Sequence, residues 1–372
     1  HQRRNDNRSR NVTSQGPKNP RMGHKGHGSR RSTDFRMSSH QYDFTKVIAT
    51  ENINRIFEES VSSKIPFMVF KTPGGKIDLA IRDDQRNFVI KPWQRASFSL
   101  NTFQSDKRFS LPTETSKEDY AAAFKKYQES FRSGNLQKGI LSCVIRQEKP
   151  QNFDPIGFFM ALCESYPNAF SYLLYHPEVG TWCGASPEVL LEGRGEQFST
   201  VALAGTQPVN SSRKYEWGEK EREEQELVSE HFREVLKNVG AQKIEESNLK
   251  IVQAGDVVHL KTDFRFTYGK TIEPLLDQLH PTPAVAGLPV YDSISLIKEV
   301  ETHERGLYTG YIGILSENEP RVFVNLRCMQ VGKKELALHV GGGITAKSNL
   351  EAEWQETRLK AKTLLNLLKS TN

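Results

Sequence analysis

The chain of 372 residues is long enough to bury a large core, and its 36% apolar and 26% charged residues are typical of a soluble protein. No run of about 18 apolar residues is present, which excludes a membrane-spanning helix, and the first residues lack the apolar segment of a secretory signal. The 4 cysteines show neither metal-binding nor disulfide-like spacing. We therefore expect a cytoplasmic protein with free thiols, and a monomer.

The positive net charge is concentrated at the start of the chain. Residues 1–36 carry ten Lys and Arg against two Asp, a charge of +8, which leaves −2 for residues 37–372 out of the total of +6. The same stretch has almost no large apolar residues, and we predict a disordered basic tail over 1–36. One interpretation is an arm that binds polyanions. We favour an idle extension ahead of Met37, and we do not expect nucleic-acid binding.

Regular elements are predicted in chain order from residue 64 onward. The first helix starts after Ser116, with Asp119 in the third position of a capping-box variant, and ends at Gly134. Strand patterns occur at 64–71, 87–91, 139–145, 169–175, 180–184, 189–192, 197–204, near 251 and 259, and at 264–268, 308–315, 321–331 and 335–340. Further helical patterns occur at 155–165, 215–239, 272–279, 293–301 and 350–368.

The predicted strands come in clusters between isolated helices and do not alternate strictly with them. This order predicts an α+β fold with largely antiparallel sheets, and it argues against a doubly wound parallel sheet. No Pro-rich or Ser-rich linker follows residue 40, and no short-period repeat occurs. We therefore expect one large domain.

Two pairs of glutamates have helical spacing. Glu221 and Glu224 are three residues apart, as are Glu353 and Glu356, so each pair projects from one face of its helix. Carboxylates from two helices suit a hard cation such as Mg²⁺, which completes its coordination with water and an anionic substrate. A solvated charged face around Glu221 and a surface ion pair between Glu356 and Lys360 are the alternatives. Spacing alone favours these alternatives over the metal site.

Small residues at the ends of predicted strands mark three further candidate segments. The segment GASPE at 184–188 presents the carboxylate of Glu188 as a possible general acid. Glycine-rich backbone at 204–206 and 340–344 allows a ligand to approach N–H donors. For GASPE and for the triple glycine, the residues alone favour an ordinary turn or bulge. The chain has no GxxxxGK[ST], no GxGxxG opening a helix and no GxSxG, so nucleotide-dependent and serine-hydrolase functions are not expected.

Taken together, these segments resemble the family of chorismate-utilising enzymes, which includes anthranilate, aminodeoxychorismate, isochorismate and salicylate synthases. The likeness covers about residues 115–370 and follows the family's motif order. The motifs are KGILS at 138–142, GASPE at 184–188, LAGT at 203–206, EREEQ at 221–225, VHL at 258–260, HPTPA at 280–284, ERGLY at 304–308, NLR at 325–327, GGGI at 341–344 and EWQET at 353–357. The resemblance implies a single α+β enzyme domain over 37–372, with two packed, mainly antiparallel β-sheets flanked by helices.

The resemblance also implies a set of site residues. Lys138 would be the general base that activates water, and Glu188 would be the general acid. Action near neutral pH requires the pKa of the lysine to be lowered from about 10.4 and that of the glutamate to be raised from about 4.3. Mg²⁺ would be held by Glu224 and Glu356, with Glu221 and Glu353 acting mostly through water. The residues expected to border the substrate carboxylates are Gly205, Thr206, His259, Tyr308, Arg327, Gly342 and Lys360.

Three positions indicate which chorismate reaction to expect. Isochorismate synthases carry lysine at the position of Lys138, where anthranilate synthases typically carry glutamine and use ammonia. Aminodeoxychorismate synthases often place a lysine nucleophile at the position of Ala204. The HPTPA loop at 280–284 is characteristic of isochorismate synthases. All three favour an isochorismate synthase, an isomerase that adds water at ring carbon 2 of chorismate as the hydroxyl leaves carbon 4.

Other functions stay open at this point. The nearest alternative is a salicylate synthase, which forms isochorismate and then eliminates pyruvate, and an ammonia-using synthase comes third. A catalytically silent binding protein with a basic tail is the alternative from another class. Gln225 and Cys143 depart from the histidine and arginine that are common in the family. Isochorismate serves menaquinone, siderophore and salicylate synthesis, and the residues do not select among these pathways.

Overall fold

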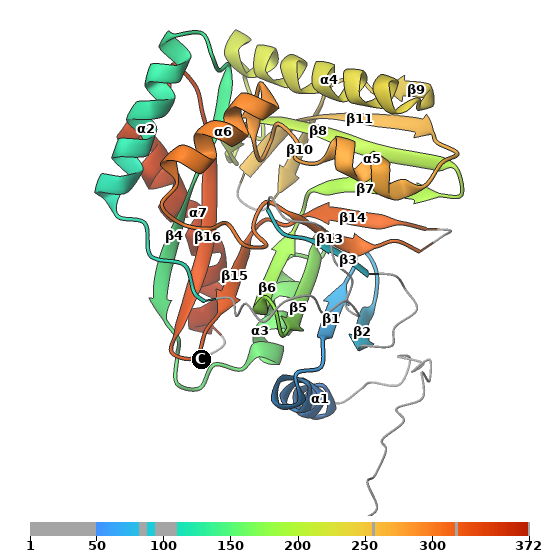
Figure 1. Cartoon of the computed structure of the whole chain (residues 1–372), viewed down its shortest axis with the longest axis vertical. Coiled ribbons are helices and arrows are strands. Elements are labelled where there is room, and N and C mark those ends of the chain that lie inside the picture. The colour runs from blue at the N-terminus through green and yellow to red at the C-terminus, as the bar shows by residue number, and fades with distance from the viewer. Residues whose placement is uncertain (1–49, 82–87, 94–109, 255–256, 317–318, 371–372) are drawn as a thin grey trace, which may run out of the picture. The chain divides into compact units, whose positions relative to one another are not determined.

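The protein was analysed as a computed structural model, which describes residues 50–81, 88–93, 110–254, 257–316 and 319–370. The predicted basic tail over 1–36 and Met37 lie outside the described residues. The described residues belong to one compact unit, in which two antiparallel sheets are flanked by helices (Figure 1). The α+β fold expected from the sequence is confirmed.

The first sheet, called sheet A, carries the strand that begins at Lys138. Its strands follow the order β12 (Gly287–Leu288), β4 (Lys138–Glu148), β16 (Glu335–Ile344), β15 (Cys328–Val331), β6 (Gly180–Ser186), β5 (Phe170–His176), β1 (Phe67–Lys71) and β2 (Ile77–Ile81). In sheet B the order is β10 (Lys250–Ala254), β11 (Val257–Thr267), β8 (Gln197–Pro208), β7 (Val189–Arg194), β14 (Arg321–Val324), β13 (Tyr311–Ile314) and β3 (Phe88–Lys91), and β9 (Gln242–Glu246) also pairs with β11.

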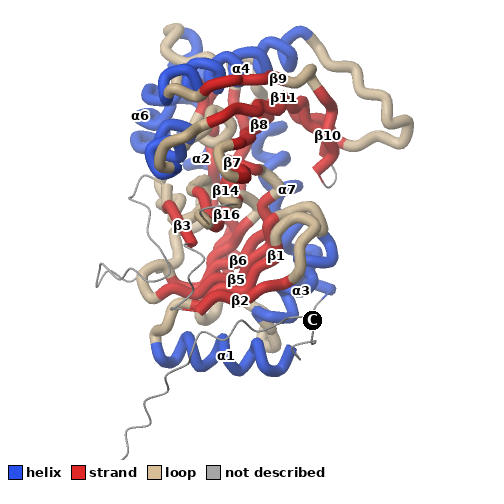
Figure 2. The backbone as a smooth tube through the Cα atoms, turned by 90° about the vertical axis from the view of Figure 1, so that its right-hand side faces the viewer, coloured by secondary structure: helices blue, strands red, loops and turns tan. Residues whose placement is uncertain are grey.

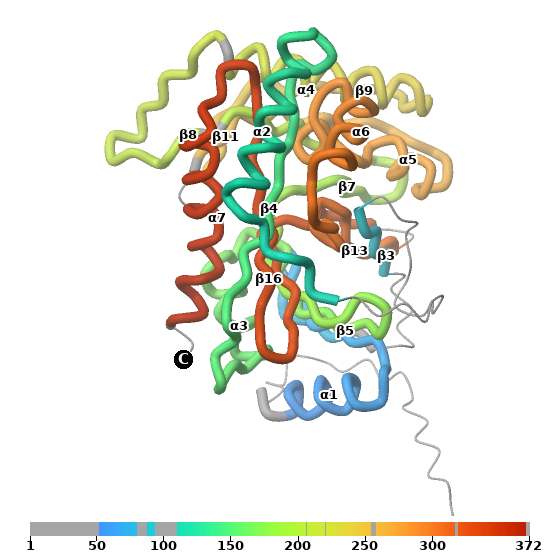
Figure 3. Tube along the Cα trace, turned by 60° about the vertical axis from the view of Figure 1, so that its left-hand side comes forward, coloured from blue at the N-terminus to red at the C-terminus, as the bar shows by residue number. Residues whose placement is uncertain are grey.

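Helices cover the outer faces of both sheets. They are α1 (Thr50–Ser63), α2 (Lys117–Arg132), α3 (Pro155–Ser165), α4 (Glu219–Val239), α5 (Ile272–Leu279), α6 (Val290–Val300) and α7 (Leu350–Ser370). Figure 3 shows α2 and α7 beside β4 and β16, whereas Figure 2 shows α4 beside β9 and β11 and α1 beside β2 and β5. None of the described helices combines the length and apolarity that a membrane span requires.

The start of helix α2 follows from a capping residue that the sequence shows. As predicted, α2 starts after Ser116, whose hydroxyl oxygen accepts the backbone N–H of Asp119 at 3.0 Å and so satisfies one of the helix's free donors. The buried face of α2 consists of Tyr120, Ala123, Phe124, Tyr127 and Phe131. The helix therefore packs one apolar face against sheet A, and its polar face stays in water.

Aromatic side chains fill the space between the two sheets. Phe170 of sheet A and Phe323 of sheet B stack with their ring centroids 4.8 Å apart. Residues of β1 alternate, so that Phe67 and Val69 belong to the core under the helices, while Met68 and Phe70 belong to the core between the sheets. Because both faces of this strand are buried, its first four residues are all apolar.

Two strand predictions were wrong in an informative way. The stretch 321–331 is not one strand, because the chain leaves β14 of sheet B and enters β15 of sheet A, and Arg327 takes a φ of +47° between them. The strand predicted to end at 340 instead continues through the three glycines to Ile344, paired with β4 along its whole length. Strand β13 starts at Tyr311, so Tyr308 precedes it. Helix α1 and strands β2, β9 and β12 were not predicted.

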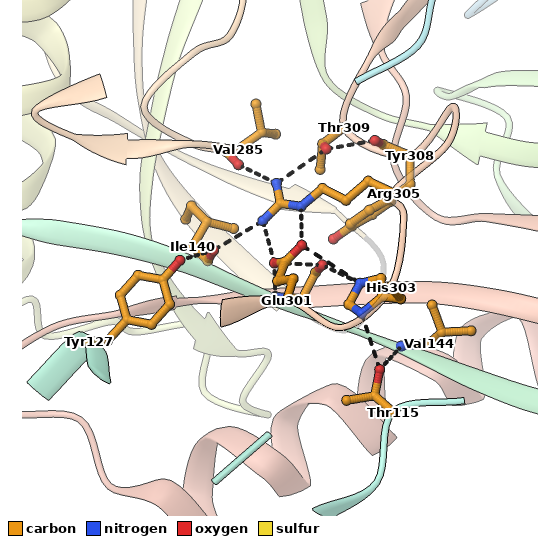
Figure 4. A network of polar contacts seen from close by, with 11 residues as sticks. Thr115, Tyr127, Ile140, Val144, Val285, Glu301, His303, Arg305, Tyr308 and Thr309 are labelled. Atoms are coloured by element: carbon orange, nitrogen blue, oxygen red, sulfur yellow. Dashed lines mark hydrogen bonds and ion pairs between the residues drawn. The ribbon is translucent and has the colours of Figure 1, made fainter. Parts of the chain in front are cut away.

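A buried ion pair joins several of these elements (Figure 4). Arg305 donates both Nε and Nη2 hydrogens to Glu301, at 2.8 and 2.6 Å. Its other N–H groups donate to the carbonyls of Val285 and Ile140 and to the hydroxyl of Thr309. The guanidinium thereby connects β4 to the Pro-rich loop and to the turn that follows α6. With every donor engaged, the buried charge is fully hydrogen-bonded.

The carboxylate of Glu301 is equally well supported. Its Oε1 accepts the backbone N–H and the hydroxyl of Ser142 at 2.9 and 2.8 Å, and His303 lies 3.7 Å from Oε2. Burial alone would raise the pKa of Glu301, but Arg305 and these further contacts hold it below its usual value. The carboxylate therefore stays ionised, and it fixes the middle of β4 a few residues beyond Lys138.

We predict that Arg305→Met lowers the free energy of unfolding by about 3–5 kcal/mol, because it leaves Glu301 charged, buried and without its guanidinium partner. Arg55→Met is the matched control: Arg55 pairs with Glu59 four residues away, but both side chains are largely exposed, so its loss costs less than about 0.5 kcal/mol. Urea denaturation at pH 7 measures both. Equal losses in the two variants would contradict the structural role of the buried pair.

Candidate active site

The glycines of β16 bring a helix close to the backbone of sheet A. A Cβ atom on Gly342 would stand 3.4 Å from Oε1 of Glu356 and 3.6 Å from Oε2 of Glu353. The two carboxylates of the predicted α7 pair therefore converge over this glycine. Lys360 joins them, since its Nζ donates to the carbonyl of Gly341 at 2.8 Å and lies 2.8 Å from Oε1 of Glu356.

Lys138 begins β4 and is buried, with 5% of its surface exposed. The strand end is pinned because Lys138 pairs with Leu288 of β12. Its Nζ lies 2.6 Å from Oε1 of Glu224 on α4, and its Cε is 3.5 Å from where a Cβ on Gly343 would stand. An ammonium ion with so little solvent requires an opposite charge, which Glu224 supplies.

Helix α4 is fixed so that its predicted glutamates face inward. Gln225 is buried, and its Nε2 donates to the carbonyl of Ala202 at 3.1 Å and to the hydroxyl of Thr262 at 3.0 Å. The Cβ of Glu221 lies 3.5 Å from where a Cβ on Gly205 would stand. Glu224 is half-buried beside Lys138. The alternative of a wholly solvated face is therefore excluded for this part of α4.

Glu188 lies between β6 and β7, next to the crossing from sheet B to sheet A. Its carbonyl accepts the N–H of Val324 at 2.9 Å, and the carbonyl of Arg327 accepts the N–H of Ala185 at 3.1 Å. Burial raises the pKa of Glu188 from 4.5 to about 7, and the positive charge of Lys138 opposes this shift. The expectation of a raised pKa at this carboxyl is confirmed.

The strands β8 and β11 bring the predicted Gly205, Thr206 and His259 together. Gly205 takes a φ of +66°, which a residue with a side chain rarely adopts. Nδ1 of His259 lies 3.2 Å from the carbonyl oxygen of Gly205, and Thr206 pairs with His259 in the sheet. Burial lowers the pKa of His259 to about 4, and the charges of Lys360 and Arg327 act in the same direction. The imidazole is therefore neutral near pH 7.

Tyr308 lies close to Gly341 of β16, and Arg327 lies near Tyr166 and influences His259. Tyr308 is buried, and its hydroxyl lies 2.8 Å from where a Cβ on Gly341 would stand. Asn325 positions this segment, because its Nδ2 donates to the carbonyl of Leu307 at 2.9 Å. The guanidinium of Arg327 lies 5.9 Å from the ring centroid of Tyr166.

These contacts link the predicted residues in two groups. Lys138 joins Glu224 to the glycine strand, and His259 lies within the field of Lys360, Arg327 and Glu356. Two supporting residues were not assigned a role from the sequence. Asn325 lay within the NLR motif, which was the available signal, whereas Trp217, packed 3.2 Å from the Cβ position of Gly205, carried none.

The acidic residues suit a cation that needs few protein ligands. Within the described ranges, no group of three or more His, Cys, Asp and Glu side chains forms a ready-made metal cage. Mg²⁺ usually takes one or two carboxylates and keeps several waters. The convergence of Glu353 and Glu356 over Gly342 offers such a pair, and Glu221 and Glu224 of α4 offer a second.

Comparisons with known proteins agree with this geometry. Residues 78–369 match the family described as "Chorismate binding enzyme". The isochorismate synthase EntC of Escherichia coli is 29% identical over 328 residues, which cover 82% of this chain and 81% of that protein. The anthranilate synthase component 1 of Haloferax volcanii is 28% identical and covers 68% of this chain and 51% of that protein.

The fold is also found among solved structures. The menaquinone-specific isochorismate synthase MenF from Escherichia coli superimposes with a TM-score of 0.71 and 21% identity, over 82% of this chain and 88% of that chain. At this level of identity the likeness concerns the fold, which is the two-sheet arrangement described above.

We predict that Glu188 makes the protein less stable as the pH rises. Its pKa is about 7 in the folded state and 4.5 without burial, so the folded protein binds more protons between these values and its stability falls as pH increases through this window. In Glu188→Gln, the stability difference between pH 5 and pH 8 shrinks by about 2–3 kcal/mol.

Urea denaturation at the two pH values measures this effect. Glu164→Gln, an exposed position on α3, serves as the control and leaves the difference unchanged. An unchanged difference in Glu188→Gln would show that Glu188 titrates in the folded protein as it does in water.

Proposed function

This chain belongs to the chorismate binding enzyme family, and we propose that it is an isochorismate synthase. The reaction is the reversible conversion of chorismate to isochorismate, in which water adds to ring carbon 2 and the hydroxyl of carbon 4 leaves. The proposal is supported by relatives that carry this name, including EntC and the vibriobactin-specific isochorismate synthase of Vibrio cholerae. Relatives are named for both siderophore and menaquinone metabolism, and the pathway of this chain is left open.

The observation that carries the proposal is the burial of Glu188 near Lys138, which raises the pKa of its carboxyl. A leaving hydroxyl needs a proton, and a carboxyl group with a pKa of about 7 still holds one near neutral pH. An ordinary exposed glutamate, with a pKa of about 4.3, would have lost it. We assign Glu188 as the general acid.

Lys138 is assigned as the general base that takes a proton from the attacking water, a role that requires the neutral amine and therefore loss of the proton that its ion pair with Glu224 stabilises. It is buried, it is close enough to Glu188 to influence that group's pKa, and it extends along the glycine strand. Glutamine cannot accept a proton in this way, so a lysine here supports water over ammonia as the nucleophile. Ala204, which has no nucleophile, is consistent with the same choice.

The remaining residues are assigned to the two carboxylates of chorismate. Tyr308, Arg327 and the backbone at Gly342 would hold the enolpyruvyl carboxylate, because a guanidinium, a phenol and free N–H groups all donate to oxygen anions. The ring carboxylate would be bordered by Gly205, Thr206, His259 and Lys360. The side chain of Thr206 lies outside the described residues, so its assignment rests on its position in β8.

We propose Mg²⁺ as the cofactor. Glu224 and Glu356 would hold it directly, and Glu221 and Glu353 would do so mostly through water. When bound, the ion would supply positive charge to the ring carboxylate of the substrate. Glu224 also contacts Lys138 at 2.6 Å, so the carboxylate that serves the ion and the group that serves as base are neighbours. Gln225 keeps Glu224 in place through its bonds to β8 and β11.

The product of the reaction tests the proposed function. Incubation with chorismate and Mg²⁺, with and without ammonium, is expected to give isochorismate only, because Lys138 activates water. Liquid chromatography resolves isochorismate, salicylate and anthranilate, and pyruvate is assayed enzymatically. Salicylate with pyruvate would establish a salicylate synthase instead, and anthranilate would refute the role of Lys138.

Lys138→Ala and Glu188→Gln are each expected to lower kcat by a factor of about 10²–10⁴, the usual contribution of a general base or acid. Far-UV circular dichroism is expected to show a folded chain in both. Lys126→Ala, an exposed lysine on α2, is the control and leaves kcat unchanged. Full activity in either site variant would remove that residue from the mechanism.

The metal assignment predicts a loss of affinity as well as of rate. Glu356→Gln is expected to weaken Mn²⁺ binding, measured by electron paramagnetic resonance, by at least about tenfold, because a neutral amide is a poorer ligand for a hard cation. Glu351→Gln on the same helix, where Glu351 pairs with Lys117 on the surface, keeps wild-type affinity. Equal affinity in both variants would place the ion elsewhere.

A further inference from the structure

The loop at 209–218 joins two segments that contribute to the proposed active site. It follows β8, which carries Gly205 and Thr206, and it leads into α4, which carries Glu221 and Glu224 (Figure 3). The apolar side chains of this loop belong to a small cluster, apart from the two larger cores, that contains Trp217, Val258 and Leu260 with Val209 and Tyr215 packed against them. The loop is therefore held to β11 by an apolar cluster in which Trp217, 9% exposed, is the largest side chain.

Trp217 packs against a bulge in β8. Ala204 and Thr206 pair with neighbouring residues of β11, so Gly205 is the extra residue of a β-bulge. The ring of Trp217 lies 3.2 Å from where a Cβ on Gly205 would stand. The carbonyl oxygen of Gly205 lies 3.2 Å from Nδ1 of His259, and since a carbonyl only accepts, this nitrogen carries the proton of the bond. The packing of Trp217 on the bulge therefore also fixes how the imidazole is held.

The start of α4 depends on the same side chain. Its N-cap, Gly218, makes no side-chain hydrogen bond, so no polar side chain fixes the first turn from that position. Trp217 directly precedes the cap, where an apolar side chain often fixes the entry of the chain into a helix. Gln207 of β8 supports the same segment, because its Nε2 donates to the carbonyl of Glu216 at 2.9 Å. Oε2 of Glu221 lies 2.7 Å from where a Cβ on Gly218 would stand, so a shift of the helix start would move this carboxylate.

We propose that Trp217 is a positioning residue for substrate binding, which holds the Gly205 bulge and the first turn of α4 against β11. It acts through Gly205 and Glu221, which are assigned to the ring carboxylate and to the ion, and not through the general acid or the general base. Loss of its ring therefore weakens the binding of chorismate and leaves the chemical step nearly as fast. The inference rests on the proposed function only in taking chorismate as the substrate.

Steady-state kinetics with chorismate separates binding from the chemical step. Trp217→Leu removes the ring but keeps an apolar side chain, and we expect KM to rise by about tenfold while kcat falls by less than about threefold, because a small misplacement of binding groups costs affinity. Trp217→Phe keeps a ring on the bulge, and its KM is expected to stay within about threefold of the wild-type value. An unchanged KM in Trp217→Leu, or a fall in kcat as large as the rise in KM, would overturn the proposal.

Tyr215→Leu is the matched control, because it removes another ring from the same cluster. The atoms nearest to the Cβ position of Gly205 belong to Trp217, Leu260 and Glu221, whereas Tyr215 packs elsewhere on the cluster. Its KM is expected to equal that of the wild type. An equal rise in KM in Tyr215→Leu would show that the stability of the whole loop sets the affinity, and it would refute a specific role for Trp217.

Calorimetric titration with chorismate measures the affinity without turnover, in the Glu188→Gln background. Adding Trp217→Leu is expected to raise the dissociation constant by about tenfold. Far-UV circular dichroism checks the folding of each variant, and Trp217→Met takes the place of Trp217→Leu if the latter does not fold. Anthranilate or salicylate as the wild-type product would end the proposed function and leave this comparison decisive. Unchanged affinity in Trp217→Leu would end the present proposal alone, and a wild-type chain that does not bind chorismate would end both.

Discussion

The buried ion pair between Lys138 and Glu224 sets the main constraint on this protein. An ammonium group with almost no exposed surface costs several kcal/mol unless an opposite charge lies against it, and the two side chains are 2.6 Å apart. Helix α4 must therefore present Glu224 toward sheet A, which the bonds of Gln225 to Ala202 and Thr262 ensure. Lys138, the first residue of β4, must also be fixed. Its pairing with β12 and the hydrogen bonds that Arg305 and Glu301 make to the backbone of β4 hold it in place.

Two buried carboxyl groups, those of Glu188 and Glu301, have pKa values that are shifted in opposite directions. Glu188 is buried, and because burial outweighs the opposing charge of Lys138, the pKa of its carboxyl rises to about 7. Glu301, buried against Arg305, has a pKa below its usual value. Two glutamates of one fold thus keep or lose a proton according to their neighbours. The surroundings of each carboxyl group thus separate the two cases.

The fold could be predicted from the sequence where the signal is local. The capped start of α2 and the 3.6-residue patterns of α3, α5 and α7 place those elements close to their observed positions. The path of the chain across 321–331 could not be predicted, because a φ of +47° at Arg327 is decided by the docking of two sheets and leaves no trace in residue types. Likewise, a run of three glycines usually marks a turn. Here residues 341–343 remain in β16, where a side chain at Gly342 would meet Glu353 and Glu356 of α7.

The order of the family motifs predicted more of the site residues than their spacing along the chain did. The glutamate pairs of α4 and α7 were visible as spacing, but their inward orientation depends on Gln225 and on Gly342, which lie in other parts of the chain.

Turnover of chorismate in water enriched in oxygen-18 tests most directly whether the buried lysine activates water. The assigned roles of Lys138 and Glu188 predict isochorismate with one labelled oxygen, at the hydroxyl of ring carbon 2, and release of the former carbon 4 hydroxyl as unlabelled water. Isochorismate without label would show that the hydroxyl migrates within the substrate, and it would contradict the assignment of Lys138 as a base for water.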